Sequence, residues 1–307
     1  MNKEKENKQK KYPVYKNDLL FKKMRNINAD MALWYTDDLK DEYEKDFDNI
    51  TARLKMCKEN NFIYLDLSRL DLEKIPKLSS YSKFDELTNV KYLFLNDNKL
   101  TTCGDRLEYF PNLEVLDVSH NAISEVTFLP NTLKEFICTN NKINSLPSHK
   151  NLKILDCTSN KINDLGTYPK LKDLNCSNNK IKIIKSYDSI TRLICRQNPL
   201  IEIQNQNILE DLDCSETLLN GKINGLPNLK GLICNHTKIN DITSLSKLET
   251  LEIVNCKMKI PYLPKLKCLM CEKIKNDNDD IKLSNKLKIK NVVNDGSVLC
   301  IIFDSFE

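Results

Sequence analysis

The residues best equipped for chemistry in this 307-residue chain are its 12 cysteines and 3 histidines. Thiolates and imidazoles hold zinc or act in nucleophilic catalysis when the fold brings them together. Cys268 and Cys271 form the only Cys-x-x-Cys pair. Residues three apart on a strand point to opposite faces, so these two thiols should diverge. His120, His149 and His236 lie in separate sequence repeats, so we predict no metal site and no Ser/His/Asp or Cys/His catalytic set.

Other motifs for chemistry are missing from the sequence. The run Asn276–Asp280 is acidic, but it lacks the glycine and the distal glutamate of an EF-hand calcium loop, and we interpret it as a solvated loop. No phosphate-binding or dinucleotide-binding glycine motif and no His-Glu-x-x-His is present. We therefore predict that the protein is not an enzyme and has no cofactor and no small-molecule substrate.

Composition argues against nucleic-acid and membrane partners. The net charge is +4, and hydrophobic residues make up 40% of the chain, which is ordinary for a globular protein. No stretch approaches the roughly 18 to 20 apolar residues that span a bilayer. Met1–Tyr15 is rich in Lys, Glu and Asn and has no apolar core, so a secretory signal peptide is not expected there.

A repeat with the pattern L-x-x-L-x-L-x-x-N-x-L organises the chain. Val90–Leu100 and Leu113–Ile123 fit it when Val and Ile are accepted for Leu. Further copies start at Leu133, Leu152, Leu171, Ile190, Leu209, Leu229, Leu248 and Leu266, and an imperfect copy starts at Phe62. This is the leucine-rich-repeat pattern. It predicts a solenoid of eleven short coils, about 19 residues each, with a parallel β-sheet on the concave face and an extended convex side.

The template asparagine follows each strand, where a buried amide can bond to the backbone of adjacent coils. Six coils carry it, and we call this set the asparagine ladder: Asn98, Asn121, Asn141, Asn160, Asn179 and Asn198. In later coils Thr217, Thr237, Cys256 and Ile274 take its place, with fewer bonding groups or none. The last coils should therefore be less regular.

Seven cysteines occupy the second inward position of a strand: Cys138, Cys157, Cys176, Cys195, Cys214, Cys234 and Cys271. Cysteine packs as a small hydrophobe, so we interpret these residues as core packing. Neighbouring strands are about 4.8 Å apart, which is within disulfide reach. A row of in-register thiols therefore favours a reducing compartment, and we predict a cytoplasmic location, in a host cell if the protein is an effector.

The two ends of the array should be capped, because a terminal coil would otherwise expose its core. Residues 32–61 are predicted as a helical cap with apolar residues at helical spacing, and its second helix would start near Asn49 or Thr51. Residues 1–31 form a flexible tail and residues 62–275 the repeats.

At the far end, residues 276–307 are expected to form a C-terminal cap. Asn294-Asp-Gly296 separates two β-branched runs, Ile289–Val293 and Ser297–Phe303. Asp-Gly between such runs predicts a β-hairpin.

The segment Ala52-Arg53-Leu54-x-x-Cys57, Asn60-Asn61 and Leu65-Asp-Leu67-Ser-x-Leu70-x-Leu72-x-x-Ile75-Pro76-x-Leu78 resembles the start of the repeats in bacterial LPX-type effectors, the YopM and IpaH type. The segment Cys176-Ser-Asn-Asn-Lys-Ile181 is similar to leucine-rich repeats of large, AT-rich DNA viruses. Both resemblances imply an intracellular protein that engages a host protein, and neither implies an enzymatic activity.

The third and fifth positions of each coil should point outward and line the concave face. The positions that we predict to contact a partner are Tyr92, Phe94, Val115, Asp117, Ile137, Ile154, Asp156, Asp173, Arg192, Ile194, Asp211, Asp213 and Ile233. Their N-terminal members would form an exposed apolar stripe, although scattered apolar residues on a sheet are also ordinary. The aspartates make the middle of the face acidic, which favours a basic patch on a protein over nucleic acid.

These features predict a non-enzymatic intracellular scaffold or host-directed effector that binds a protein through its concave face. An alternative is a substrate-recruiting adaptor for a ubiquitin ligase, which would dock through the apolar-rich segment Tyr12–Met31. A secreted receptor ectodomain is a third possibility, and the expected lack of a signal peptide and the row of thiols disfavour it.

Overall fold

The computed structural model describes residues 50–78, 84–272, 281–283, 289–295 and 298–303. The chain divides into two units, residues 1–52 and 53–307, and the repeats lie in the second. Helix α3 (Ile50–Glu59) begins where the second cap helix was predicted. The predicted tail, the first cap helix and the proposed ligase-docking segment lie outside the described residues.

One large sheet runs through the repeat unit. Its eleven parallel strands are β1 (Tyr64–Asp66), β2 (Tyr92–Phe94), β4 (Val115–Asp117), β6 (Glu135–Ile137), β7 (Ile154–Asp156), β8 (Asp173–Asn175), β10 (Arg192–Ile194), β12 (Asp211–Asp213), β14 (Gly231–Ile233), β16 (Thr250–Ile253) and β18 (Cys268–Glu272). Each begins two residues after a repeat start predicted from the sequence. The predicted leucine-rich-repeat solenoid is therefore confirmed.

The coils differ in length at the N-terminal end. Nine short coils between β2 and β18 advance by 18 to 23 residues, as measured between register partners such as Tyr92 and Val115 or Thr250 and Cys268. The first coil is longer than the others, because Tyr64 pairs with Tyr92, 28 residues on, which agrees with the predicted starts at Phe62 and Val90. The 3-10 helix η2 (Phe84–Asn89) takes up part of this extra length.

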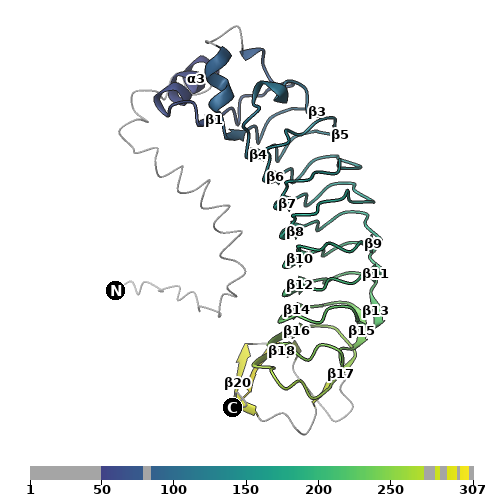
Figure 1. Ribbon diagram of the computed structural model, residues 1–307. Coiled ribbons are helices and arrows are strands. Elements are labelled where there is room, and N and C mark those ends of the chain that lie inside the picture. The colour runs from purple at the N-terminus through teal and green to yellow at the C-terminus, as the bar shows by residue number, and fades with distance from the viewer. Residues whose placement is uncertain (1–49, 79–83, 273–280, 284–288, 296–297, 304–307) are drawn as a thin grey trace, which may run out of the picture. The chain divides into compact units, whose positions relative to one another are not determined.

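The return side of the coils is extended, as predicted. Four pairs of short parallel strands lie there: β3 (Thr102–Cys103) with β5 (Glu125–Val126), β9 (Ile183–Ile184) with β11 (Glu202–Ile203), β13 (Asn220–Lys222) with β15 (Lys238–Asp241), and β17 (Met258–Ile260) with β19 (Ile281–Leu283). Figure 1 shows these pairs opposite the large sheet. Between residues 84 and 272 the only helices are η2 and the single 3-10 turn η3 (Leu107–Tyr109). No helix in the described residues could cross a membrane.

The core lies between the large sheet and the returns. The second residue of each of the eleven parallel strands is buried, and its neighbours in the sheet are the equivalent residues, as in Leu155 between Phe136 and Leu174. The seven predicted core cysteines are buried and reduced. Cys271 points into the core, while Cys268 is half-exposed on the opposite face, so the Cys-x-x-Cys pair diverges as expected.

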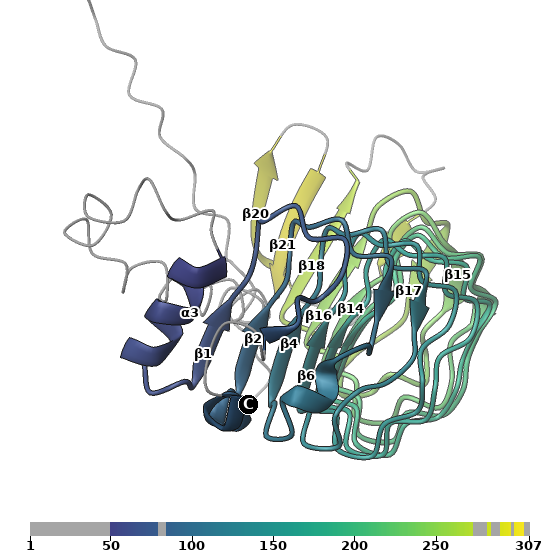
Figure 2. The same ribbon diagram turned by 90° about the horizontal axis from the view of Figure 1, so that it is seen from above.

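The predicted hairpin closes the sheet at its C-terminal edge. Strands β20 (Ile289–Asp295) and β21 (Val298–Phe303) pair antiparallel, and β21 also pairs antiparallel with β18. Figure 2 shows the hairpin beside β18 at the end of the large sheet. The last parallel strand is therefore not a free edge, which removes a template for unwanted strand pairing.

Candidate functional site

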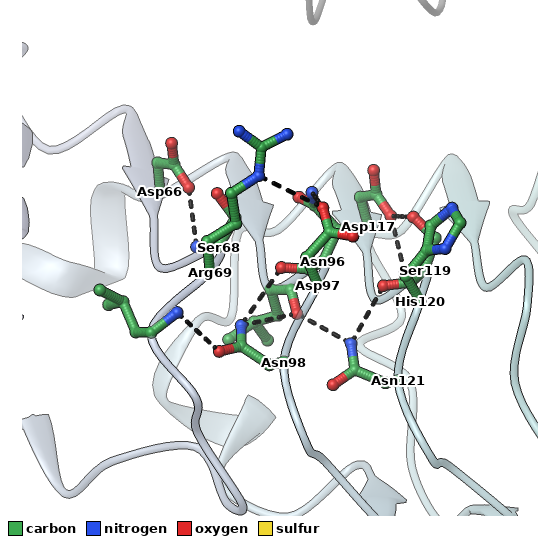
Figure 3. Close-up of polar contacts among 12 residues, drawn as sticks. Asp66, Ser68, Arg69, Asn96, Asp97, Asn98, Asp117, Ser119, His120 and Asn121 are labelled. Carbon is green, nitrogen blue, oxygen red and sulfur yellow. Dashed lines mark hydrogen bonds and ion pairs between the residues drawn. The ribbon is translucent and has the colours of Figure 1, made fainter. Parts of the chain in front are cut away.

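The candidate site is the outward face of the large sheet together with the turns at the strand exits. The asparagine ladder fixes these turns. Asn98 Oδ1 accepts hydrogen bonds from the N–H groups of Leu70 and Leu72, each at 3.0 Å, and its Nδ2 donates to Leu67 O and Leu95 O at 2.8 and 2.9 Å. Figure 3 shows Asn98 and Asn121 in this arrangement. Each ladder amide thus ties its own coil to the preceding one.

The ladder weakens where the sequence predicted it. Thr217 Oγ1 donates to Cys214 O of its own coil at 2.7 Å. Thr237 Oγ1 donates to Cys234 O of its own coil and also lies 3.7 Å from Cys256 Sγ of the next coil. Cys256 Sγ donates to Cys234 O at 3.0 Å. A hydroxyl or thiol at this position cannot reproduce the amide's combination of two donors and an acceptor.

The residue before each template position has a positive φ, and this accounts for two of the three histidines. His120 and His236 have φ values of 54° and 55°, as do the equivalent residues of other coils. His149 is buried, and its Nε2 lies 2.9 Å from Pro130 O. Within the described residues no three His, Cys, Asp or Glu side chains gather closely enough to hold a metal ion. The histidines therefore have turn and core roles.

Several aspartates that we predicted as partner contacts also stabilise the strand exits. Asp117 accepts hydrogen bonds from the N–H of Ser119, at 2.8 Å, and from its hydroxyl, and its side chain is buried (Figure 3). Asp156 accepts the same two bonds from Thr158, at 3.1 and 2.7 Å. Asp213 accepts the N–H of Ser215 at 3.1 Å. The signal that sequence reasoning missed is Asp-x-Ser/Thr, whose side chains form such local turns.

Arg192 was also predicted to face a partner, and the structure corrects this. Its Nε lies 2.7 Å from Asp173 Oδ1 on the neighbouring strand, and the two side chains are only 7% and 13% exposed. The two residues face each other at the third position of adjacent coils. They neutralise each other within the sheet face, so Arg192 adds little positive charge to it.

The exposed apolar stripe predicted at the N-terminal end is wrong for two of its members. Phe94 is 4% exposed and Val115 is 9% exposed. The ring of Phe94 lies against that of Tyr64 on the preceding strand, with centroids 5.0 Å apart. Phe94 is the register partner of Asp66, so Tyr64 is its diagonal neighbour on the same face, a separation that aromatic side chains can bridge. The other apolar residues predicted on this face are partly exposed: Tyr92, Ile137, Ile154, Ile194 and Ile233.

The middle of the sheet face is acidic and partly shielded from water. We define the acidic face as Glu135, Asp156, Asp173, Asp211, Asp213 and Glu252, all of them half-buried. Two of these carboxylates have a cation beside them, Arg192 at Asp173 and Arg196 at 3.7 Å from Asp213. Burial raises the pKa of the Glu135 carboxyl, and the nearby charges of Asp173 and Glu114 raise it further. Burial also raises the pKa of Asp213, although the hydrogen bonds from Ser215 oppose this. Keeping these two carboxylates in the charged form therefore costs free energy.

A polar cleft lies at the opposite ends of the strands, where they begin. It has a volume of about 500 Å³ and is lined by Asn89, Lys91, Asn112, Glu114, Thr132, Lys134, Asn151, Lys153 and Lys170. Glu114 pairs with Lys134 at 2.6 Å and with Lys91 at 3.7 Å, and the hydrogen bond from Lys134 lowers its pKa. Four lysines against one glutamate leave this edge basic.

Comparison with known proteins finds a matching family model and similar solved structures for these repeats. Residues 88–131 match the family model described as leucine-rich repeats in two copies. YopM, a leucine-rich effector protein from Yersinia pestis, is similar with a TM-score of 0.62 and 20% identity over 75% of this chain and 68% of that one. A leucine-rich-repeat protein of Leptospira interrogans is similar with a TM-score of 0.55 and 21% identity over 75% of each chain.

A comparison of the sequence with curated proteins finds no significant match. At the identities found, likeness to solved structures concerns the fold alone, and the similarity to viral repeat proteins stays a prediction. The stacked coils, their amide ladder, the matched repeat model and the structural relatives agree on one conclusion: the repeat unit of this chain has the leucine-rich-repeat fold.

Proposed function

We propose that this protein is a non-enzymatic scaffold that binds a basic surface of a protein partner through its acidic face. The observation that carries the proposal is the gathering of half-buried carboxylates on one rigid sheet, with raised pKa values at Glu135 and Asp213. Like charges held together away from water cost free energy in the free protein. A partner that brings lysines or arginines to this face removes part of that cost.

The charge distribution also favours one orientation of the partner. The acidic face covers the middle of the sheet, while the cleft of lysines lies along the edge where the strands begin. A partner with basic residues opposite the face and acidic residues opposite the edge would meet complementary charge at both. Complementary charge of this kind sets register and raises association rates more than it raises affinity.

A host-directed effector in a reducing compartment is the biological role that we propose for this scaffold. The fold it shares with YopM, described as an effector protein, supports the first part of this proposal. The buried, reduced cysteines in register on adjacent strands support the second, because oxidising conditions would threaten such a core.

The test compares two double variants of equal charge change. Glu135→Gln with Asp211→Asn removes two charges from the acidic face, whereas Glu125→Gln with Glu202→Gln removes two from exposed positions on the return side. Each protein is used to capture partners from the cell of origin, and bound proteins are quantified by mass spectrometry.

The proposal requires one basic protein that the wild type and the return-side variant capture equally and the acidic-face variant loses. Binding should also weaken as salt rises, because the contact is partly electrostatic. Equal capture by all three proteins would refute the role of the acidic face while leaving the fold unaffected.

A further inference from the structure

Three sulfur-bearing residues, Cys268, Met270 and Cys300, lie on neighbouring positions of the sheet face where the last repeat joins the hairpin. Cys268 Sγ lies 3.5 Å from Cys300 Sγ, between β18 and β21. Met270 is the register partner of Cys300 and lies two residues from Cys268 on the same strand. All three are half-exposed, whereas the intervening Leu269 and Ile301 are buried, so the three side chains share the outward face.

The other ten cysteines are set apart from this pair by burial. Cys268 and Cys300 are half-exposed, while the rest are buried. Burial raises the pKa of the neighbouring Cys271 to about 11 and that of Cys103 to about 12. Thiolate is the form that binds metals and reacts. The chain therefore presents two thiols side by side at its surface. The other ten are buried, including Cys256, whose pKa a hydrogen bond with Cys234 lowers to about 6.

We propose that Cys268, Met270 and Cys300 bind one soft, thiophilic metal ion of the copper(I) class. Thiolate and thioether together select such ions. A zinc site needs four donors of sulfur, nitrogen or oxygen, and among the described residues no third His, Cys, Asp or Glu joins the two thiols. Two thiolates and a thioether are suited to a low-coordinate ion of this class instead.

The spacing of the thiols fits an ion held between them. Metal–sulfur bonds are about 2.3 Å long, which puts two ligands of a trigonal site about 4.0 Å apart. The observed separation of 3.5 Å is shorter by about half an ångström, within the reach of small side-chain rotations. Binding would displace the two thiol protons and join β18 to β21, fastening the hairpin to the last repeat.

The test is an anaerobic titration of the full-length protein with copper(I) in the presence of a chromophoric copper(I) chelator and a non-thiol reductant. The wild type should take one equivalent from the chelator. Cys268→Ser and Cys300→Ser should each abolish this uptake, and Met270→Leu should reduce it. Met56→Leu, at a half-exposed methionine in α3, is the matched control and should behave like the wild type. Uptake that is absent in the wild type, or unchanged in both serine variants, overturns the proposal.

Alkylation of the wild-type protein gives a second readout that does not depend on the folding of a variant. Without copper(I), Cys268 and Cys300 should react with iodoacetamide first, and one equivalent of copper(I) should protect both. Peptide mass spectrometry identifies the modified residues. Protection that maps to other cysteines, or no protection at this pair, contradicts the site.

Discussion

The asparagine ladder allows a prediction in both directions, because some coils have the amide and others have lost it. Asn179 Oδ1 accepts the N–H of Ile162 at 2.9 Å, and its Nδ2 donates to Cys157 O at 3.0 Å, Cys176 O at 3.1 Å and Ser177 O at 3.1 Å. Thr217, at the same position two coils later, makes only the bond within its own coil. Exchanging these residue types should therefore move stability in opposite directions.

The magnitude follows from which groups are left without a partner. In Asn179→Thr the hydroxyl can keep the bond to Cys176 O, as Thr217 does to Cys214 O. Cys157 O also keeps a bond, from Asn160 Nδ2 at 3.0 Å. The N–H of Ile162 loses its acceptor, which costs about 1–3 kcal/mol, and the weaker bond to Ser177 O adds about 1 kcal/mol. We expect a total loss of about 2–4 kcal/mol.

The reverse substitution, Thr217→Asn, should stabilise the protein by about 1 kcal/mol, because the new Oδ1 can accept the N–H of Leu200. Both variants are compared by urea unfolding and by amide hydrogen exchange of Ile162 and Leu200. Asn163→Thr, the same change at an exposed position, is the control and should change the free energy of unfolding by less than about 0.5 kcal/mol. If Asn179→Thr unfolds like this control and Ile162 keeps its exchange protection, the ladder does not stabilise the coils as we infer.

Three further predictions concern charge and backbone. Arg192→Met leaves the largely buried Asp173 carboxylate without its cation and should lower the free energy of unfolding, measured with urea, by about 3–5 kcal/mol. The double variant Arg192→Met with Asp173→Leu should recover most of that loss. Equal losses in the single and double variants would argue against the pair. Gly104→Ala places a Cβ 2.4 Å from Phe128 N at a φ of +126° and should lower the free energy of unfolding by well over 1 kcal/mol. Gly221→Ala has open space around it and should cost only about 1 kcal/mol, because of its φ of +69°. Similar losses would show that the contact with Phe128 is unimportant. The pKa values of Glu135 and Asp213 are raised above 4.5 and 3.8, so these carboxyls gain protons as the pH falls from 7 through that raised range. Their protonation favours the folded state relative to the unfolded state and should weaken the capture of a basic partner. Capture that is constant from pH 7 to 4 would count against the acidic face.

The repeat pattern was sufficient to predict the strands because the same apolar positions recur in every coil. A leucine at the fourth position, such as Leu93 or Leu116, has equivalent leucines above and below it, so the register of each strand is set by its neighbours. The hairpin was equally accessible, since Asp295-Gly296 is a local signal. The 28-residue length of the first coil followed from the starts at Phe62 and Val90, but the 3-10 helix η2 inside it was not predicted, because the repeat pattern does not cover that segment.

The roles of individual outward residues were harder to predict, because they depend on contacts between coils. Asp117 was expected to be exposed on the sheet face, yet it is buried and accepts hydrogen bonds from the serine two positions on. The burial of Phe94 depends on a tyrosine 30 residues earlier. A second polar row was missed for the same reason: Asn112, Asn151 and Asn228 each donate, one residue before a repeat start, to a carbonyl of the preceding coil.

The direction of the asparagine ladder has a mechanical consequence. Each ladder amide accepts an N–H from the coil before it, so the coils from Asn98 to Asn198 are cross-linked in series, whereas the coils of Thr217 and Thr237 lack this link. When the two chain ends are pulled apart, the contacts between coils after Asn198 should break at a lower force. The C-terminal coils should therefore unfold before the N-terminal ones. The N-terminal coils should therefore resist extension more than the C-terminal coils, to which the hairpin is attached.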